Sequence, residues 1–158
     1  MEEILSLVSK ANRSFQTADH LAYVTYPLLK ETKLVITITE NLYSAFICAM
    51  DAFLAYERMY KRIHEIPQDF RSRLEVFSKI APRYGIGRDQ VLLIEDLKRV
   101  IDCRNKSPIE FVRQDKLVIC SEDYKMRTLS YDKVKDYLVK SKPFFTALNR
   151  VFRENREK

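Results

Sequence analysis

Residues 42–56 form the most apolar stretch of the chain, and they restrict the possible folds more than any other segment. Only Ser44 and Asp51 within them are plainly polar. Because no turn residue separates this stretch from the β-branched run 34–39, a single helix over residues 27–64 is favoured over a strand. A helix that is apolar on nearly all sides is buried on several sides. About 15 residues with an acid inside are too few for a membrane span, which needs about 20.

The same segment carries two neighbouring helical stripes. The large side chains predict a face in the core: Leu42, Phe46, Ala49, Phe53, Tyr56 and Tyr60. The small side chains form a seam beside it: Ala45, Cys48, Ala52 and Ala55. Since helix separation depends on the side chains at the contact, the seam permits close approach of another helix, in the same chain or in a second copy. A homodimer is therefore expected.

Apolar residues also recur at helical spacing on either side of this segment. Residues 2–23 predict a first helix that breaks before Pro27, which suits the first turn of the next helix because its missing N–H is not needed there. Residues 70–84 predict a third helix that stops at Gly85. A fourth follows over residues 89–105, with Asp89 as the candidate N-cap.

The remaining segment predicts a helical turn, a hairpin and a last helix. Residues 107–110, "SPIE", fit a capping box that opens a short helical turn. Two β-rich runs then predict a hairpin over about residues 116–129. Ser130 can cap a last helix over about residues 131–155, which Pro143 is expected to kink. The sequence therefore predicts one all-α domain over residues 1–158, with about five helices and a β-hairpin before the last.

Composition agrees with a single helical domain and adds an uneven charge. The chain has 158 residues, 46% of them hydrophobic, with 2 glycines and no tryptophan, which argues against disorder and against a β-sandwich. Residues 1–57 carry 4 basic and 7 acidic side chains, whereas residues 58–158 carry 24 and 15, so the net charge of +6 lies in the second part. Clustered basic residues bind nucleic acid by releasing its counterions, and a solvated basic surface is the alternative.

Three stretches carry a resemblance to a known superfamily: "ADHLAYVTYPLLKETKL", "ENLYSAFICAMDAFLAYERMYKRI" and "RNKSPIEF". They resemble the HEPN superfamily, and in particular small archaeal proteins of HEPN-like type. The resemblance covers most of the chain. It implies an antiparallel helical bundle that pairs with a second copy.

The resemblance also bears on catalysis. HEPN ribonucleases carry an arginine, often followed by a polar residue, and a histidine after four to six intervening residues. Arg104 and Asn105 match the first part, but positions 109–111 hold no histidine, so the usual general acid/base is missing. Glu110 could act as a base only with a raised pKa. The resemblance therefore implies a member that binds RNA or partners a nucleotidyltransferase chain without cutting RNA.

Two further sets of residues are candidates for binding. Arg104 can bind phosphate through its planar guanidinium, or it can pair with Asp51 or another acid inside the bundle. Asp51 needs a cationic partner if it faces inward, or it lies on a solvent-facing strip. Basic and aromatic residues of the hairpin region can contact phosphates and stack on bases, or they protect the sheet edge: Arg113, Lys116, Tyr124, Lys125 and Arg127.

No cofactor or metal is expected. His20 and His64 have no metal-type spacing, and the three cysteines lack a C-x-x-C motif, which suits reduced thiols. The start of the chain has no basic and apolar leader, so a cytoplasmic protein without a membrane span is expected. The leading functional hypothesis is a non-catalytic module for RNA or for a nucleotidyltransferase chain. A ribonuclease with an unusual acid/base and a purely structural interaction protein are the alternatives.

Overall fold

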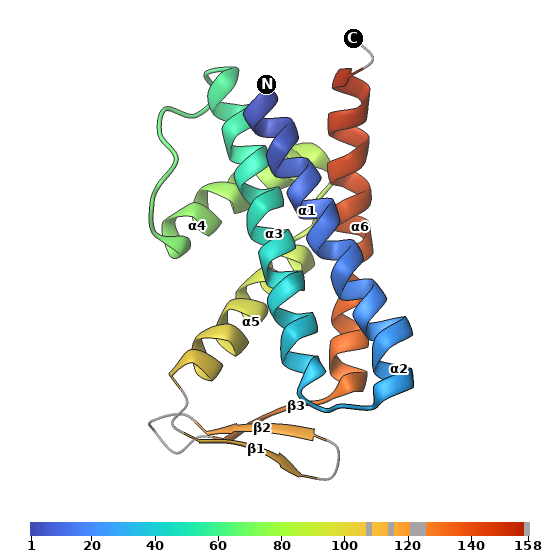
Figure 1. Cartoon of the computed structure of the whole chain (residues 1–158). Coiled ribbons are helices and arrows are strands. Elements are labelled where there is room, and N and C mark those ends of the chain that lie inside the picture. Colours follow the sequence, from blue (N-terminus) through green and yellow to red (C-terminus); the bar gives the residue numbers. More distant parts are fainter. Residues whose placement is uncertain (107–108, 114–115, 121–125, 157–158) are drawn as a thin grey trace.

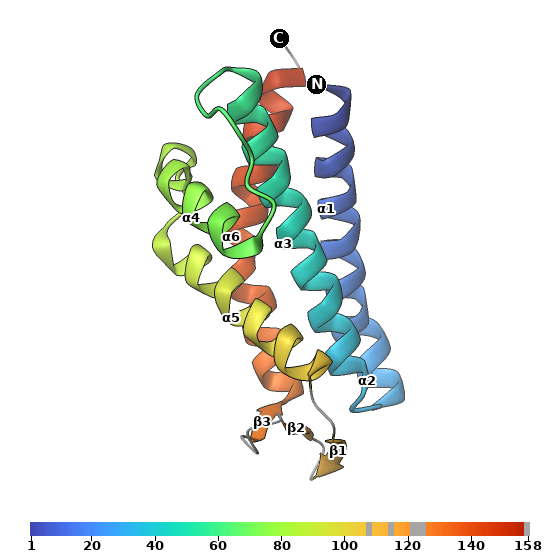
Figure 2. The same ribbon diagram turned by 90° about the vertical axis from the view of Figure 1, so that its left-hand side faces the viewer.

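Five helices of eleven residues or more and one small sheet make up the described part of the chain, which comprises residues 1–106, 109–113, 116–120 and 126–156 of a computed structural model. The long helices are α1 (Glu2–His20), α3 (Leu34–Met59), α4 (Phe70–Ile80), α5 (Arg88–Asn105) and α6 (Tyr131–Arg156). Helices α1, α3 and α6 run side by side, and α4 and α5 cover the side of α3 that faces away from α1 (Figures 1 and 2). The all-α prediction is confirmed.

Helix α3 is the centre of the core, as its apolar sequence predicts. The ring of Phe53 lies 4.8 to 6.1 Å, centroid to centroid, from four rings of other elements: Phe77, Tyr84, Phe144 and Phe152. Of the described helices, α3 meets the length and composition of a membrane-spanning helix, and half of its most apolar 18-residue stretch is buried inside the bundle. The core helix of a soluble protein passes the same test.

The boundary between the first two helices differs from the prediction. Helix α1 does not break before Pro27 but continues through a π-helical turn, η1 (Leu21–Thr25), into α2 (Tyr26–Leu29). A wider turn relieves the clash between the proline ring and the carbonyl four residues earlier. The break comes instead at Lys30, whose φ of 52° is left-handed and whose N–H donates to the Tyr26 carbonyl at 2.7 Å. The prediction of one helix over residues 27–64 is therefore wrong.

Helix α3 also ends earlier than expected. It stops at Met59, and Lys61 takes a left-handed φ of 58°, which turns the chain away before His64.

Two later boundaries are set by local capping. Asp69 caps α4 by accepting from the Ser72 N–H at 3.0 Å, and Gly85, with a φ of 74°, ends the 3₁₀ turn η2 (Ala81–Tyr84) as predicted.

The N-cap of α5 is Gly87, so the prediction of Asp89 as the cap is wrong. Asp89 lies in the first turn of α5, and its carboxylate accepts from the Gln90 side chain at 3.1 Å. A carboxylate in the first turn is still stabilised by the positive end of the helix dipole. Helix α5 ends at Asn105, as expected.

A three-stranded antiparallel sheet lies at the end of the bundle near α2, in the order β1 (Ile109–Arg113), β2 (Lys116–Cys120) and β3 (Met126–Leu129) (Figure 1). The β2–β3 hairpin is confirmed, but the helical turn predicted from a capping box over 107–110 is wrong. Ile109 and Glu110 pair with Cys120 and Ile119 as part of β1. Pairing of a β-branched run with β2 outweighs the local capping signal.

Helix α6 follows the sheet directly and confirms the predicted last helix. The Ser130 hydroxyl accepts from the Lys133 N–H at 3.2 Å and caps it, and Pro143 lies within it. The sheet joins the core through the alternate residues Leu117 and Ile119 of β2, which are buried with Leu129 of β3. The chain thus forms one bundle with a single continuous core in its described part.

Candidate functional site

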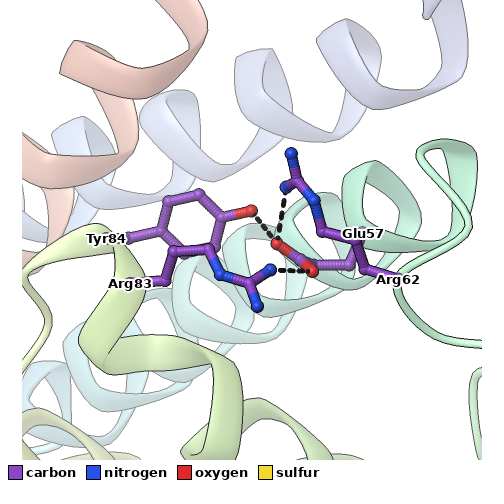
Figure 3. A network of polar contacts seen from close by, with 4 residues as sticks. All are labelled: Glu57, Arg62, Arg83 and Tyr84. Carbon is purple, nitrogen blue, oxygen red and sulfur yellow. Dashed lines mark hydrogen bonds and ion pairs between the residues drawn. The ribbon is translucent and has the colours of Figure 1, made fainter.

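A buried carboxylate with arginines around it lies at the end of the bundle opposite the sheet. Glu57, in the last turn of α3, is fully buried. It accepts from Arg83 Nη1 at 2.6 Å, from Arg62 Nη1 at 3.2 Å and from the Tyr84 hydroxyl (Figure 3). Arg150 of α6 joins the group by donating to the Tyr84 carbonyl at 3.0 Å. These five residues are called the Glu57 cluster below.

Local geometry brings the cluster together. Glu57 follows Phe53 by four residues and Leu54 by three, so it continues the buried face of α3. The left-handed Lys61 then reverses the chain, and the Arg62 N–H donates to the Glu57 carbonyl at 2.9 Å. Arg83 and Tyr84 come from η2, which packs on α3 through the contact of the Tyr84 and Phe53 rings.

The carboxylate of Glu57 is held in its charged form. Burial alone would raise the pKa of Glu57, but hydrogen bonds from Tyr84, Arg83 and Arg62 outweigh it and lower this pKa below its usual value. Burial and the neighbouring carboxylate raise the pKa of Tyr84, so its hydroxyl keeps its proton and acts as a donor. Glu57 therefore remains an anion at neutral pH.

The Glu57 cluster keeps an excess of positive charge. The cluster holds one carboxylate and three guanidinium groups, of which those of Arg62 and Arg83 contact the carboxylate. The side chains of Arg62 and Arg83 are 41% and 53% exposed. Each guanidinium has five N–H donors in a planar fork, and each of these two uses one nitrogen on Glu57. Their solvent-facing nitrogens can bind an anion such as a phosphate group.

An aromatic ring lies beside these arginines. Tyr60 is half-exposed, and the Arg62 guanidinium carbon lies 5.1 Å from the centre of its ring. The Tyr56 ring packs against it in an edge-to-face arrangement, at a centroid separation of 4.9 Å. A supported and exposed ring next to cationic groups can stack on a planar base.

Asp51 has the cationic partner that an inward-facing acid requires, but it is not Arg104. Its carboxylate accepts from Arg73 Nη1 at 3.0 Å, and Arg73 Nε donates to the Pro67 carbonyl at 2.6 Å. The Asp51 side chain is 26% exposed. Burial raises the pKa of Asp51, and the opposing effect of Arg73 is smaller. The Asp51–Arg73 ion pair therefore links α4 to α3, and the bond from Arg73 to Pro67 links α4 to the loop before it.

Arg104 and Asn105 lie in the last turn of α5, at the other end of the bundle from the Glu57 cluster (Figure 1). Arg104 Nη1 lies 3.9 Å from Glu40 Oε1, and both side chains are partly exposed. The acid beside Arg104 is thus Glu40 of α3. Asn105 is exposed. His20 ends α1 and His64 lies in the loop after α3, so neither follows Arg104 in the chain.

The candidates in the hairpin region fall mostly outside the described side chains. Lys116 is exposed at the start of β2 and pairs across the strands with Arg113 of β1. The backbones of Glu110 and Arg127 lie in β1 and β3. Tyr124 and Lys125 lie outside the described residues, as do the side chains of Glu110, Arg113 and Arg127.

Across the described residues, no group of three or more His, Cys, Asp or Glu side chains could hold a metal ion. Cys48 and Cys103 are half-buried free thiols.

The sequence interpretation missed the Glu57 cluster altogether. A signal for it exists, because Glu57 continues the apolar stripe of α3 and a lone acid there needs partners. The identity of those partners depends on the turns at Lys61 and Gly85, which bring Arg62, Arg83 and Tyr84 to it.

No family model, curated protein or solved structure matches this chain.

Proposed function

We propose that this chain is a non-catalytic module that binds RNA through phosphate contacts at the Glu57 cluster. The observation that carries the proposal is the convergence of Arg62 and Arg83 on one buried carboxylate, which holds both guanidinium groups in place while half of each side chain faces solvent. Groups that are already ordered lose less conformational entropy when they bind a phosphate. The net charge of +6 adds long-range attraction.

Tyr60 favours a single-stranded nucleic acid over a simple anion. Its half-exposed ring lies beside Arg62, so a phosphate on the guanidinium would place the neighbouring base near the ring. Base stacking on an aromatic side chain contributes about 1–3 kcal/mol for each base and is tolerant of sequence. The proposed binding is therefore sensitive to salt and only weakly selective for sequence.

The HEPN-like architecture belongs to the same proposal. It is supported by the helical bundle and by an Arg-Asn step that closes α5. The non-catalytic assignment is supported by the positions of the two histidines, since neither follows Arg104. A homodimer is part of the same proposal, and a nucleotidyltransferase chain is the alternative partner to RNA.

The test is fluorescence anisotropy with a labelled single-stranded RNA of mixed sequence, at several salt concentrations. The double variant Arg62→Gln/Arg83→Gln is expected to bind roughly tenfold more weakly or worse and to show a smaller salt slope. The charge-matched control is Lys30→Gln/Lys33→Gln, near α2 at the other end of the bundle. It is expected to bind nearly as well as the parent protein.

Circular dichroism of each variant separates lost binding from lost folding, and Arg83→Lys keeps the charge if Gln proves too disruptive. Equal weakening in the two double variants would mean that binding is only a property of net charge. Undetectable binding by the parent protein would overturn the proposal and favour a protein partner.

The ribonuclease alternative has its own test. The parent protein and Arg104→Ala are incubated with the same RNA and resolved on a denaturing gel. Intact RNA is expected in both lanes. Cleavage by the parent protein alone would establish that Arg104 and Asn105 belong to a working nuclease with an atypical acid/base.

A further inference from the structure

A groove of about 340 Å³ lies between α1 and α6, and its charge is entirely positive in the described part of the chain. We call it the α1–α6 groove. Its charged lining residues are Arg13 of α1 and Arg153 of α6, and no acidic side chain among the described residues lines it. The groove between α4 and α5 differs in this respect, because Asp69, Glu95 and Asp102 line it beside basic residues. The α1–α6 groove is therefore suited to a negatively charged ligand.

An amide pair at the centre of this groove fixes how α1 and α6 lie against each other. The side-chain nitrogens of Asn12 and Asn149 each donate to the oxygen of the other, at 2.8 and 3.0 Å. The helices run antiparallel, since both ends of the chain lie at the same end of the bundle (Figure 1). Arg13 lies one residue after Asn12, and Arg153 lies four residues after Asn149. Their α-carbons are thus offset by roughly 7–8 Å along the helix axes.

The tilt of helical side chains reduces this offset. Every Cα–Cβ bond in a helix points toward the N-terminus of its own helix. In this antiparallel pair, Arg13 therefore tilts toward the level of Arg153, and Arg153 tilts toward the level of Arg13. Both residues are exposed, and neither forms an ion pair with an acid among the described residues. Two guanidinium groups that approach each other repel, and an anion between them removes the repulsion.

A phosphate monoester matches this pair of charges. It carries about two negative charges at neutral pH, one for each arginine. Each guanidinium can donate two parallel N–H bonds to phosphate oxygens. A carboxylate has a single charge and would neutralise only one of the two. The groove volume lies at the small end of the range for small-molecule sites, about 300–1,000 Å³, so it suits one phosphate-bearing group rather than a length of polymer.

We infer that the α1–α6 groove binds a phosphate monoester through Arg13 and Arg153. Two sources offer this chemistry: a free phosphorylated small molecule and the 5′-phosphate at an RNA end. The inference does not rest on the RNA binding proposed above, since it uses none of the residues of the Glu57 cluster.

The experiment is an NMR titration of the full ¹⁵N-labelled chain with phenyl phosphate, and with benzoate as a singly charged analogue, at constant ionic strength. Phenyl phosphate is expected to shift the side-chain amide resonances of Asn12 and Asn149 and the backbone resonances of 9–16 and 149–153. Benzoate is expected to bind roughly tenfold more weakly. Equal affinity for benzoate, or no shift in the groove with phenyl phosphate, would overturn the inference.

A second pair of titrations separates the two sources. A short RNA with a 5′-phosphate and the same RNA with a 5′-hydroxyl are compared at the groove resonances. Groove shifts with the phosphorylated RNA alone would support the inference and identify an RNA end as the source. Groove shifts with phenyl phosphate and with neither RNA would support it for a free small phosphate. Equal groove shifts with both RNAs would overturn it, because recognition would then not require a monoester.

Two variants and one control locate the contact. Arg13→Gln and Arg153→Gln each keep a long polar side chain and remove the charge, and each is expected to weaken binding of phenyl phosphate roughly tenfold. Both positions are exposed, so the fold is retained. The matched control Lys10→Gln removes the same charge from an exposed position of α1 outside the groove lining, and it should leave the affinity nearly unchanged. Equal loss in Lys10→Gln and Arg13→Gln would also overturn the inference.

Discussion

Tyr84 donates its hydroxyl hydrogen to the carboxylate of Glu57, a residue that precedes it by 27 positions in the chain. The contact joins the end of α3 to η2 across a loop and a whole helix. Because Glu57 is fully buried, its negative charge is stabilised by hydrogen-bond donors from two other segments. These donors are Arg62, in the loop after α3, and Arg83 and Tyr84, in η2.

Truncation of Glu57 should therefore destabilise the protein strongly. Glu57→Ala is expected to lower the free energy of unfolding by about 3 kcal/mol, because it leaves a cavity and removes the acceptor of three donors. Glu57→Gln should cost less, since it keeps the volume. Urea unfolding at neutral pH measures both. The control Glu75→Ala, at an exposed position of α4, should stay within about 0.5 kcal/mol of the parent protein.

The two partly or fully buried acids of α3 should respond to acid in opposite directions. The pKa of Glu57 is lowered in the fold, so its stabilising contribution is complete above the unfolded pKa and is lost as the pH falls through the folded pKa. The pKa of Asp51 is raised by burial, so its ionised form costs stability, and protonation removes that cost.

The measurement is the free energy of unfolding of the parent protein minus that of Glu57→Gln, and likewise for Asp51→Asn, from about pH 7 to about pH 3. The Glu57 difference should shrink on acidification, and the Asp51 difference should shift in favour of the parent protein. Parallel curves would contradict the assigned directions of the two pKa shifts.

Position 30, where the backbone of Lys30 is left-handed, should accept glycine more readily than any residue with a side chain. A side chain at a φ of 52° costs about 1 kcal/mol, and glycine avoids this cost but is more flexible in the unfolded chain. Lys30→Gly is expected to raise the midpoint of thermal unfolding, while Lys30→Val lowers it. Lys10→Gly, on the exposed face of α1, should lower it, as glycine does inside a helix. A lower midpoint for Lys30→Gly would contradict the left-handed conformation.

The π-helical turn η1 should depend on Tyr131. The Tyr131 hydroxyl donates to the Ala22 carbonyl inside η1, and the Tyr131 and Tyr26 rings stack at 3.9 Å. Tyr131→Phe keeps the stacking and is expected to lower the free energy of unfolding by about 1 kcal/mol. Hydrogen exchange should show faster opening of residues 21–26. Tyr23→Phe, at a half-exposed position of η1, should change neither quantity appreciably.

Periodicity predicted most of the helices because it reports a property of the isolated segment. The apolar stripe of α3 and the spacing along α6 determine which faces are buried whatever else the chain does. Gly85 and Ser130 were also read correctly, since each terminates or caps its helix through its own backbone or side chain.

The features that were missed depend on partners distant in sequence or on strain. The end of α2 at Lys30 carries no glycine to mark it, and residues 109–110 join a strand because β2 is available to pair with them. The Glu57 cluster needs two turns to assemble, and the partner of Asp51 proved to be Arg73, from a helix whose position the sequence does not reveal. Local patterns cannot identify contacts of this kind.

The reciprocal amide pair between Asn12 of α1 and Asn149 of α6 spans 137 positions of the chain, with N···O distances of 2.8 and 3.0 Å. Helix α6 follows the other described elements along the chain, so it leaves the ribosome after them, and its side chains Phe144, Phe145 and Phe152 complete the core around α3. Until then the apolar face of α3 lacks its cover. Nascent chains of this protein should be clients of chaperones until α6 emerges, and truncation within α6 should direct the chain to degradation.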